Sequence, residues 1–286
     1  MPKLAVLGQP ISHSRSPAMH AAALAEMGLA QEWSYEAIEV SPEQFEERVR
    51  AMPREGFVGA NVTVPHKLAA LAIADDASEA DEAIGAANTL SFTDERISAT
   101  NTDASGIIEA LPASPAGMRA LVLGAGGSAR AAVWALGQAG ARVSVWNRTP
   151  ERADALAREL GAEVEAPGDG PLPTNDYELL LNATSVGMEA ANVDRARPGT
   201  PETEPAAGAA DLKRLRLDAD AINARQIVVD LVYGTAETEL AAAARARGAT
   251  VVDGLEVLVH QGAASLRLWT GMDPPIEAMK RAARRT

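Results

Sequence analysis

Four short polar stretches carry most of the side chains with which this chain could bind a small molecule. They are "ISHSRSP" (residues 11–17), "GANVTVPHK" (59–67), "IGAANTL" (84–90) and "ATNTDASG" (99–106). Paired serine hydroxyls at a helix start suit a carboxylate, and asparagine and aspartate side chains suit a ligand with several hydroxyl groups. The four stretches therefore predict a site for a small polar ligand.

Lys67 ends the second of these stretches and is one of four lysines in a chain that otherwise uses arginine. A lysine amine can give up its proton when its surroundings lower its pKa, whereas an arginine guanidinium stays charged. Lys67 is therefore a candidate for acid–base chemistry, and the alternative is an exposed charge at a helix start. His13 and His66 have no second histidine or acid at metal-ligand spacing, so we expect no metal site.

The stretch "LVLGAGGSARAAV" (residues 121–133) fits the pattern G-x-G-x-x-A between a strand and a helix. Gly124 allows a tight turn, Gly126 lets a pyrophosphate approach the backbone, and Ala129 keeps the helix close to the strand. The helix N-terminus then faces the phosphates. The alternative is a glycine turn used for packing alone. The pattern predicts dinucleotide binding by Gly124, Ala125, Gly126, Gly127, Ser128 and Ala129.

The strand that follows this helix indicates which dinucleotide binds. NAD sites place an acidic residue at the end of this strand, where it holds the ribose 2′-hydroxyl. Here the strand ends in Asn147, Arg148 and Thr149, with no acid. Arg148 can pair with a 2′-phosphate, and the alternative is a solvated charge at a helix entry. The sequence therefore predicts NADP.

Strand-like apolar runs alternate with helical patterns along most of the chain. In the first part, we expect strands at residues 3–8, 33–40 and 59–64, each followed by a helix. From about Thr102 the pattern restarts: the segment around Gly124 is followed by a strand at 141–147, a helix and then three further strands. This alternation predicts an α/β fold: two units in tandem with mostly parallel sheets. The first three polar stretches, including the one that carries Asn88, are then expected at strand-to-helix junctions, which meet at one edge of a parallel sheet, where ligands bind.

Three other segments complete the expected organisation. Ser16 and Pro17 form a favourable helix start, with the serine as cap. The segment 255–271 is a long amphipathic helix that can pack on either unit. Residues 189–210 are rich in proline, alanine, glutamate and threonine, so we expect a loop there.

The composition excludes several classes of protein. The chain has 286 residues, 47% of them hydrophobic, a net charge of -13 and no cysteine. The negative charge argues against nucleic acid as a partner, because phosphate neutralisation needs clustered cations. The apolar runs are too short for a signal peptide or a membrane span, so we expect no membrane partner and a cytoplasmic location. The sequence leaves monomer and homodimer open.

Taken in order, these motifs resemble those of the shikimate dehydrogenase family. Besides the polar stretches and the glycine turn, the resemblance includes "NRT" (147–149), "NATSVGM" (182–188), "DLVY" (230–233) and "DGLEVLVHQGAASLRLWTG" (253–271). It covers nearly the whole chain at about the family's spacing. It implies reversible reduction of 3-dehydroshikimate to shikimate by NADPH, a step toward chorismate and the aromatic amino acids.

The resemblance also implies a domain organisation. Residues 1–103 would form the shikimate-binding domain, completed by residues 255–286 from C-terminal helices that pack back on it. Residues 104–254 would form a Rossmann-type NADP-binding domain. A cleft that opens and closes would lie between the two domains.

Several residue roles follow from the same resemblance. Lys67 and Asp103 would be the catalytic pair, with Lys67 either the proton donor or a fixed cation that stabilises an alkoxide. Ser14 and Ser16 would hold the substrate carboxylate together with Tyr233.

The remaining roles concern the ring hydroxyls of the substrate and the nicotinamide of the cofactor. The residues expected at the ring hydroxyls are Asn61, Thr63, Asn88 and Gln261. Those expected near the nicotinamide are Thr184, Met188 and Gly254.

Three rival functions share this scaffold. One is a quinate/shikimate dehydrogenase that works with NAD or NADP, against which the sequence "WNRT" (146–149) speaks. Another is a non-catalytic NADP-binding regulator, which would not need Lys67 and Asp103. The third is a folate-pathway dehydrogenase. The stretches "HSRSP" and "NTD" do not support it, because their side chains suit a ligand with several hydroxyl groups.

Overall fold

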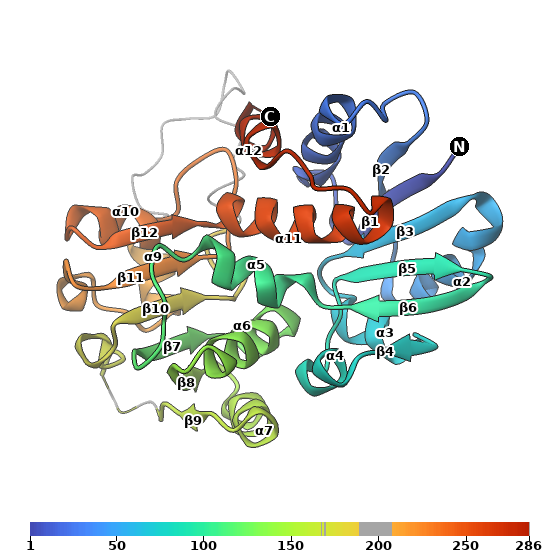
Figure 1. The fold of residues 1–286 in the computed structure, drawn as a ribbon. Coiled ribbons are helices and arrows are strands. Elements are labelled where there is room, and N and C mark those ends of the chain that lie inside the picture. The colour runs from blue at the N-terminus through green and yellow to red at the C-terminus, as the bar shows by residue number, and fades with distance from the viewer. Residues whose placement is uncertain (167, 169, 189–207, 286) are drawn as a thin grey trace, which may run out of the picture. The chain divides into compact units, whose positions relative to one another are not determined.

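The computed structural model describes residues 1–166, 168, 170–188 and 208–285. The chain forms two compact units, one of Met1–Ala110 with Leu255–Thr286 and the other of Leu111–Gly254. A boundary at residue 103 would cut the helix α5 (Thr102–Ala110), which the first unit keeps whole. Each unit holds a six-stranded sheet with helices around it (Figure 1). The expected α/β fold class is confirmed.

The first unit is built on a mixed sheet with the strand order β2-β1-β3-β5-β6-β4. Its strands are β1 (Lys3–Gly8), β2 (Ser34–Glu39), β3 (Phe57–Val62), β4 (Asp76–Ala77), β5 (Thr89–Thr93) and β6 (Arg96–Thr100). Its α-helices are α1 (Ser16–Glu26), α2 (Phe45–Ala51), α3 (Lys67–Ala72), α4 (Glu79–Ile84), α5, α11 (Gly254–Thr270) and α12 (Ile276–Arg285), with the 3₁₀ turns η1 (Pro42–Gln44) and η2 (Met52–Glu55).

Both faces of β1 are buried, which explains why its sequence is an uninterrupted apolar run. Leu4 packs into a cluster with α1, α11 and α12, whereas Ala5 and Leu7 pack into a second cluster with α2 and β3. β1 pairs in parallel with both β2 and β3. The strand therefore fixes the centre of this unit.

The C-terminal helices complete the first unit. Val259 and Leu266 on α11 and Met279 on α12 pack against Met19 and Leu24 on α1. Figure 1 shows α1 and α12 side by side. Burying these side chains is the main source of stability for such a layer, at about 1.5–3 kcal/mol for each large residue. Residues from both ends of the chain thus share one core.

The second unit has an all-parallel sheet with the strand order β12-β11-β10-β7-β8-β9. Its strands are β7 (Arg119–Leu123), β8 (Arg142–Trp146), β9 (Glu163–Val164), β10 (Leu179–Asn182), β11 (Ile227–Asp230) and β12 (Thr250–Asp253). Its described helices are α6 (Gly127–Gln138), α7 (Pro150–Leu160), α9 (Gly208–Arg214) and α10 (Glu239–Ala246), with η3 (Thr174–Asp176) and η4 (Ala219–Ala221).

This strand order is that of the Rossmann fold, in which ligands bind where the order reverses. Here the reversal lies between β7 and β10, whose last residues Leu123 and Asn182 are paired. The strand expected at 141–147 is present as β8, and the three strands expected after it are present as β10, β11 and β12. The predicted helix after β8 is also present, and it ends at Gly161, whose positive φ of 70° is a common helix stop.

Two local expectations are only partly met. Most of the loop expected at 189–210 lies outside the described residues, but 208–210 already belong to α9. Ser16 is the first residue of α1 and not its cap. Its backbone N–H is instead accepted by the Ser14 hydroxyl at 3.3 Å.

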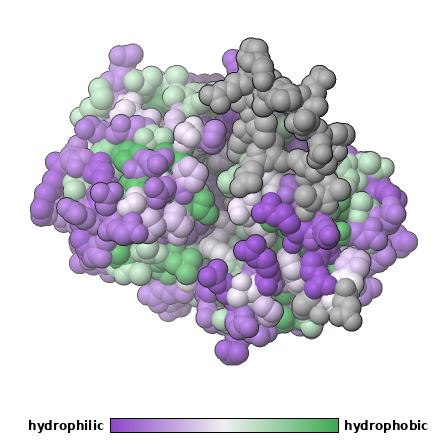
Figure 2. Space-filling view, turned by 180° about the vertical axis from the view of Figure 1, so that it is seen from behind, coloured by the Kyte–Doolittle hydropathy of each residue, from purple (hydrophilic) through white to green (hydrophobic). Residues whose placement is uncertain are grey.

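On the face shown in Figure 2, hydrophilic side chains dominate, with small apolar patches between them. This distribution agrees with the net charge of -13. No described helix combines the length and the apolar character that crossing a membrane requires.

Candidate active site

Lys67 and Asp103 form a close ion pair in the first unit. The Lys67 Nζ lies 2.5 Å from Asp103 Oδ2, and each side chain is 11% exposed. Lys67 is the first residue of α3, and Asp103 lies in the first turn of α5. A carboxylate in contact with the amine holds the amine at a fixed position. Two side chains that sequence motifs predicted separately are therefore in direct contact.

Asn88 and Gln261 extend this pair into a hydrogen-bonded network. The Asn88 amide donates to Asp103 Oδ1 and to Gln261 Oε1, both at 2.9 Å. The side-chain carbonyl oxygen of Asn88 accepts the backbone N–H of Thr102 at 2.7 Å. Asn88 and Gln261 are both buried. Because both carboxylate oxygens are matched to donors, the carboxylate has little freedom to turn away from Lys67.

A second buried layer supports Asn61. Its amide donates to Ser265 Oγ at 2.9 Å, and its side-chain carbonyl oxygen accepts the Tyr35 hydroxyl at 2.8 Å. The hydroxyls of Thr89, Thr102 and Ser265 lie 2.8 to 3.1 Å from one another. This cluster connects β3, β5, α5 and α11 below the Lys67–Asp103 pair.

Tyr35 and Ser265 were not predicted from the sequence. Ser265 lies one helical turn after Gln261, and Trp269 lies one turn further, so the three share a face of α11. Trp269 donates its indole N–H to the Leu90 carbonyl at 3.1 Å. The i, i+4 spacing was a signal that could have identified Ser265. Tyr35 sits in an ordinary strand pattern and offered no comparable signal.

The structure places Asn88 differently from the prediction. Asn88 does not lie at a strand-to-helix junction: it follows α4 and comes just before β5. β5 runs antiparallel to β3, with Asn61 paired to Thr89. The start of β5 therefore lies at the edge where β3 ends, and Asn88 joins the site from the opposite chain direction.

We call residues 11–16, which include Ser14 and Ser16, the serine turn. The serine turn follows β1, and Thr63 follows β3. Thr63 donates its backbone N–H to the Leu7 carbonyl at 2.8 Å. The His20 Nδ1 lies 2.9 Å from the Ser16 carbonyl, and the His20 ring stacks on Tyr35 at a centroid distance of 4.0 Å. Burial lowers the pKa of His20 to about 4, so the ring is neutral at neutral pH. His20 and Tyr35 thus connect the serine turn to Asn61.

The other two histidines singled out earlier differ in their surroundings. His66 is buried, stacks on Phe45 at a centroid distance of 4.4 Å, and has its Nε2 2.8 Å from the Val40 carbonyl. His13 is exposed. His66 is therefore a structural residue. The described part of the chain holds no group of three or more histidine, aspartate or glutamate side chains arranged to bind a metal ion.

In the second unit, the glycine turn links β7 to α6. Gly124 has a φ of 117°, and a Cβ there would lie 3.1 Å from the Ala183 carbonyl oxygen and 3.3 Å from Thr184 Cγ2. Gly126 precedes α6 as its N-cap, and a Cβ on it would meet nothing within 4 Å. Ala129 is fully buried. The space beside Gly126 and the N-terminus of α6 fit the approach of a pyrophosphate.

Asn147, Arg148 and Thr149 follow β8 beside this turn. The Gly124 N–H donates to the Trp146 carbonyl at 2.8 Å, which joins the turn to the end of β8. The Asn147 amide donates to the Thr149 carbonyl at 2.9 Å, and Arg148 is exposed. An exposed guanidinium at this position can pair with a phosphate from solvent.

The remaining predicted residues of this unit also lie after the carboxyl ends of its strands. Thr184 and Met188 follow β10, Tyr233 follows β11, and Gly254 follows β12. A Cβ at Gly254 would lie 2.6 Å from the Leu231 carbonyl oxygen, so the backbone segments touch there. Five parallel strands thus bring all the predicted residues of this unit to one edge of the sheet.

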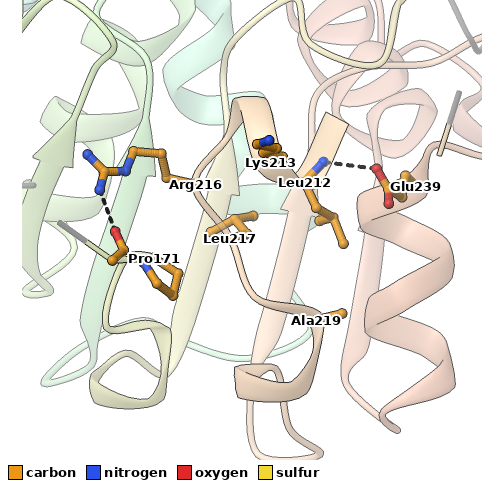
Figure 3. Close-up of a pocket in the computed structure, with 8 residues that line it drawn as sticks. Pro171, Leu212, Lys213, Arg216, Leu217, Ala219 and Glu239 are labelled. Atoms are coloured by element: carbon orange, nitrogen blue, oxygen red, sulfur yellow. Dashed lines mark hydrogen bonds between the residues drawn. The ribbon is translucent and has the colours of Figure 1, made fainter. Parts of the chain in front are cut away.

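A pocket of about 580 Å³ lies elsewhere in the second unit. Its lining includes Leu212, Arg216 and Glu239, shown in Figure 3. The Leu212 N–H donates to Glu239 at 2.8 Å, and Arg216 donates to the carbonyl of Gly170 at 2.5 Å. The pocket shares no residue with the predicted substrate or cofactor residues, so we do not assign it to the active site.

Comparisons with known proteins agree with the geometry. Residues 6–90 match the shikimate dehydrogenase substrate binding domain, residues 109–189 match shikimate / quinate 5-dehydrogenase, and residues 254–284 match the shikimate 5'-dehydrogenase C-terminal domain. A shikimate dehydrogenase (NADP(+)) of Thermus thermophilus is 43% identical over 288 residues, which cover 100% of this chain and 98% of that protein. The chain belongs to the shikimate dehydrogenase family. The family predicted from the motifs is confirmed.

Further relatives support this membership. The shikimate dehydrogenase (NADP(+)) of Acidiphilium cryptum is 40% identical over 276 residues, covering 95% of this chain and 91% of that protein. A crystal structure of the Thermus thermophilus shikimate 5-dehydrogenase in complex with NADP(H) and shikimate has a TM-score of 0.83 and 42% identity. It covers 100% of this chain and 99% of that chain. The α/β architecture is therefore that of the family along the whole chain.

Proposed function

We propose that this protein is an NADP-dependent shikimate dehydrogenase that reversibly reduces 3-dehydroshikimate to shikimate. The observation that carries the proposal is the contact between Lys67 and Asp103 at 2.5 Å, inside a network that includes Asn88 and Gln261. Family membership alone does not require this contact. A regulator that merely binds the cofactor would have no use for an amine held against a carboxylate within a hydrogen-bonded network.

The roles of the two residues follow from the charge that develops during the reaction. When a ketone is reduced, its oxygen gains negative charge and then takes a proton. Lys67 is the group proposed at this oxygen, either as the proton donor or as a cation that stabilises the charge. Asp103 orients the amine, and Asn88 holds the other carboxylate oxygen in place. In the reverse reaction Lys67 would take up the proton or stabilise the same charge.

The side chains proposed to bind the substrate in the first unit suit a carboxylate that carries several hydroxyl groups. Ser14 and Ser16 are proposed to bind the carboxylate together with Tyr233. Asn61, Thr63, Asn88 and Gln261 are proposed to bind the ring hydroxyls. The network that already connects Asn61, Asn88 and Gln261 supports this assignment, because it fixes the directions in which their amides can bind a ligand.

The second unit is proposed to bind NADP, which supplies the hydride. The open space at Gly126 and the N-terminus of α6 suit the pyrophosphate. Arg148 is proposed to pair with the 2′-phosphate, with Asn147 and Thr149 beside it. Thr184, Met188 and Gly254 are proposed to lie near the nicotinamide.

The cytoplasm is the proposed location. Cell fractionation with an antibody against the protein would test it. Monomer and homodimer are both compatible with the proposed chemistry, because Lys67, Asp103, Asn88 and Gln261 come from one chain. Analytical ultracentrifugation would distinguish the two states.

A steady-state assay that crosses shikimate and quinate with NADP and NAD tests the proposed function. We expect the highest kcat/KM for shikimate with NADP, followed through the absorbance of the reduced nicotinamide. Comparable rates for quinate with NAD would favour the quinate/shikimate dehydrogenase instead. A purified, folded protein that binds NADPH but oxidises neither substrate would favour the regulator.

A further inference from the structure

Asp230 is a buried carboxylate at the end of β11, and the proposed chemistry does not use it. Its side chain belongs to a residue that is 1% exposed. One oxygen accepts the Asn182 amide at 2.9 Å and the Val232 backbone N–H at 3.2 Å. The other oxygen accepts the Thr238 hydroxyl at 2.6 Å. All three of these donors are neutral groups from separate points along the chain.

The bond to Asn182 determines how the turn after β10 is held. A carboxylate can only accept, so the Asn182 NH₂ group must face Asp230 and its carbonyl oxygen must face the other way. That oxygen accepts the Thr184 backbone N–H at 3.1 Å and the Thr184 hydroxyl at 2.7 Å. The Thr184 hydroxyl in turn accepts the Val186 N–H at 3.1 Å. Asp230 thereby sets the orientation of the whole turn.

The other two bonds hold the segment after β11. Thr238 is the N-cap of α10, and its hydroxyl also accepts the Ala241 N–H at 3.1 Å. Val232 precedes Tyr233, and its N–H is fixed by the same carboxylate that fixes Asn182. A single side chain therefore joins the segment that carries Thr184 to the segment that carries Tyr233.

A carboxylate at this position is costly for folding. Burial raises the pKa of Asp230, and the charge of Asp211 raises it further. The ionised form is therefore less favourable in the folded chain than in the unfolded chain. An uncharged side chain of similar size would fill the same space at lower cost. Packing alone does not explain the residue.

We propose that Asp230 is a positioning residue that holds the 183–188 turn and the 231–238 segment in the arrangement that binds the nicotinamide half of the cofactor. It does so through Asn182 on one side and through Thr238 and Val232 on the other. The inference rests on the proposed function, which places Thr184 and Met188 near the nicotinamide. Asp230 itself touches neither substrate nor cofactor in this role.

Two ligands separate this role from a structural one. NADPH carries both halves of the dinucleotide, whereas adenosine 2′,5′-bisphosphate carries the adenine, the 2′-phosphate and one further phosphate but no nicotinamide. Asp230→Leu keeps a side chain of similar size but removes both acceptor oxygens, so the Asn182 amide, the Val232 N–H and the Thr238 hydroxyl all lose their partner. We expect NADPH to bind at least 10-fold more weakly, while adenosine 2′,5′-bisphosphate binds within 2-fold of wild type.

The conservative variant Asp230→Asn provides the contrast. Its carbonyl oxygen can still accept from Asn182 and Val232, and its NH₂ group can donate to the Thr238 hydroxyl, which can accept as well as donate. We expect this variant to keep most of the NADPH affinity that Asp230→Leu loses. Gln226→Ala is the matched control, because Gln226 is buried directly before the same strand, where it donates to Thr174 and Tyr177 carbonyls at 2.6 and 2.9 Å. It should lower the melting temperature but leave the ratio of the two affinities unchanged.

Fluorescence of the bound dihydronicotinamide reports NADPH affinity without any turnover, so this experiment is independent of the activity assay. Wild-type protein that fails to oxidise shikimate would contradict the proposed function, and the affinity ratio would still test Asp230. Equal weakening of both ligands in Asp230→Leu would overturn the positioning role, as would an unchanged NADPH affinity.

Discussion

The two units build their proposed sites from different materials. In the first unit, Asp103, Asn88 and Gln261 are buried side chains that hydrogen-bond one another around Lys67. In the second unit, the cofactor turn offers backbone groups, open space beside Gly126 and an exposed Arg148. A ring with several hydroxyls needs donors and acceptors in fixed directions, whereas phosphates bind to any suitable array of N–H groups and positive charge.

The sheets differ in a corresponding way. In the all-parallel sheet of the second unit, every predicted residue follows a strand end. The mixed sheet of the first unit also brings in Asn88 from the start of β5, and α11 adds Gln261 from far along the chain. Substitutions in the first unit should therefore disturb chemistry, whereas those in the cofactor turn should mainly change cofactor preference.

The largest expected effect tests the first half of this comparison. Lys67→Ala should lower kcat for shikimate oxidation by about 1,000-fold, because general acid–base groups contribute ~10²–10⁴-fold. NADPH affinity, measured by fluorescence titration, should stay near the wild-type value. Lys213→Ala, which removes an exposed lysine of the second unit, is the control and should change neither quantity. Turnover within a few-fold of wild type in Lys67→Ala would refute the catalytic role.

The second prediction concerns stability in acid. Each unit has a buried titratable group, and burial lowers the pKa of one, His20, but raises the pKa of the other, Asp230. The pKa of His20 is lowered by burial to about 4, from 6.5, so the unfolded chain takes up a proton first as the pH falls. The stability that a neutral His20 contributes to the first unit is therefore complete above pH 6.5 and is lost between pH 6.5 and about 4. A difference of this size corresponds to about 3 kcal/mol.

Hydrogen exchange of the β1 amides, corrected for the intrinsic pH dependence of exchange, measures this loss. His20→Gln should flatten the profile between about pH 6.5 and 5, whereas His13→Gln, which changes an exposed ring, should not. The β11 amides should not show the same loss, because burial raises the pKa of Asp230 and acid then removes an unfavourable charge. Parallel losses in β1 and β11 would contradict the contrast between the units.

A third and smaller effect is expected from the cofactor side. Arg148→Ala should raise the KM for NADPH by about 10- to 100-fold, because a hydrogen bond to a charged group contributes about 1.5–3 kcal/mol. The KM for NADH should change little, since NADH lacks the 2′-phosphate. Arg142→Ala removes an exposed arginine at the other end of β8 and serves as the control. An equal rise for both cofactors would show that Arg148 does not distinguish them.

The smallest effect concerns the layer that supports Asn61. Tyr35→Phe removes the donor to the Asn61 side-chain carbonyl oxygen, which should cost about 1 kcal/mol. We expect the KM for shikimate to rise several-fold while NADPH affinity is retained. Tyr177→Phe, which removes a hydroxyl bound to Glu165 in the second unit, is the matched control. A shikimate KM unchanged by Tyr35→Phe would show that Asn61 does not depend on this contact.

What could be predicted from the sequence depended on how local the signal was. The strand–turn–helix around Gly124 has its geometry specified by neighbouring residues, so both its elements and its position were predicted correctly. The turn after β10 carried a recognisable motif, but the role of Asp230 beneath it was not visible. That role depends on a hydrogen bond between residues 48 positions apart in the sequence.

The first unit was harder to predict because its site depends on strand direction and on distant contacts. An antiparallel β5 and a parallel one have similar residue patterns, so the place of Asn88 in the sheet was misjudged. Ser265 contacts Thr89 across 176 positions in the sequence, and no motif links the two segments. Side-chain chemistry could be inferred from local sequence, whereas the contacts that orient those side chains required the three-dimensional structure.

The first unit consists of two segments that lie far apart in the sequence, and this affects how the chain folds as it is synthesised. All of residues 111–254 emerge from the ribosome before α11 and α12 do, so the second unit can complete its core early. The β1 and α1 segments leave the ribosome before residues 111–254 but lack their partners Val259, Leu266 and Met279 until α11 and α12 follow. We expect the segment of β1 and α1 to remain sensitive to proteases and to bind chaperones until α11 and α12 have been made, although it is synthesised before the whole second unit.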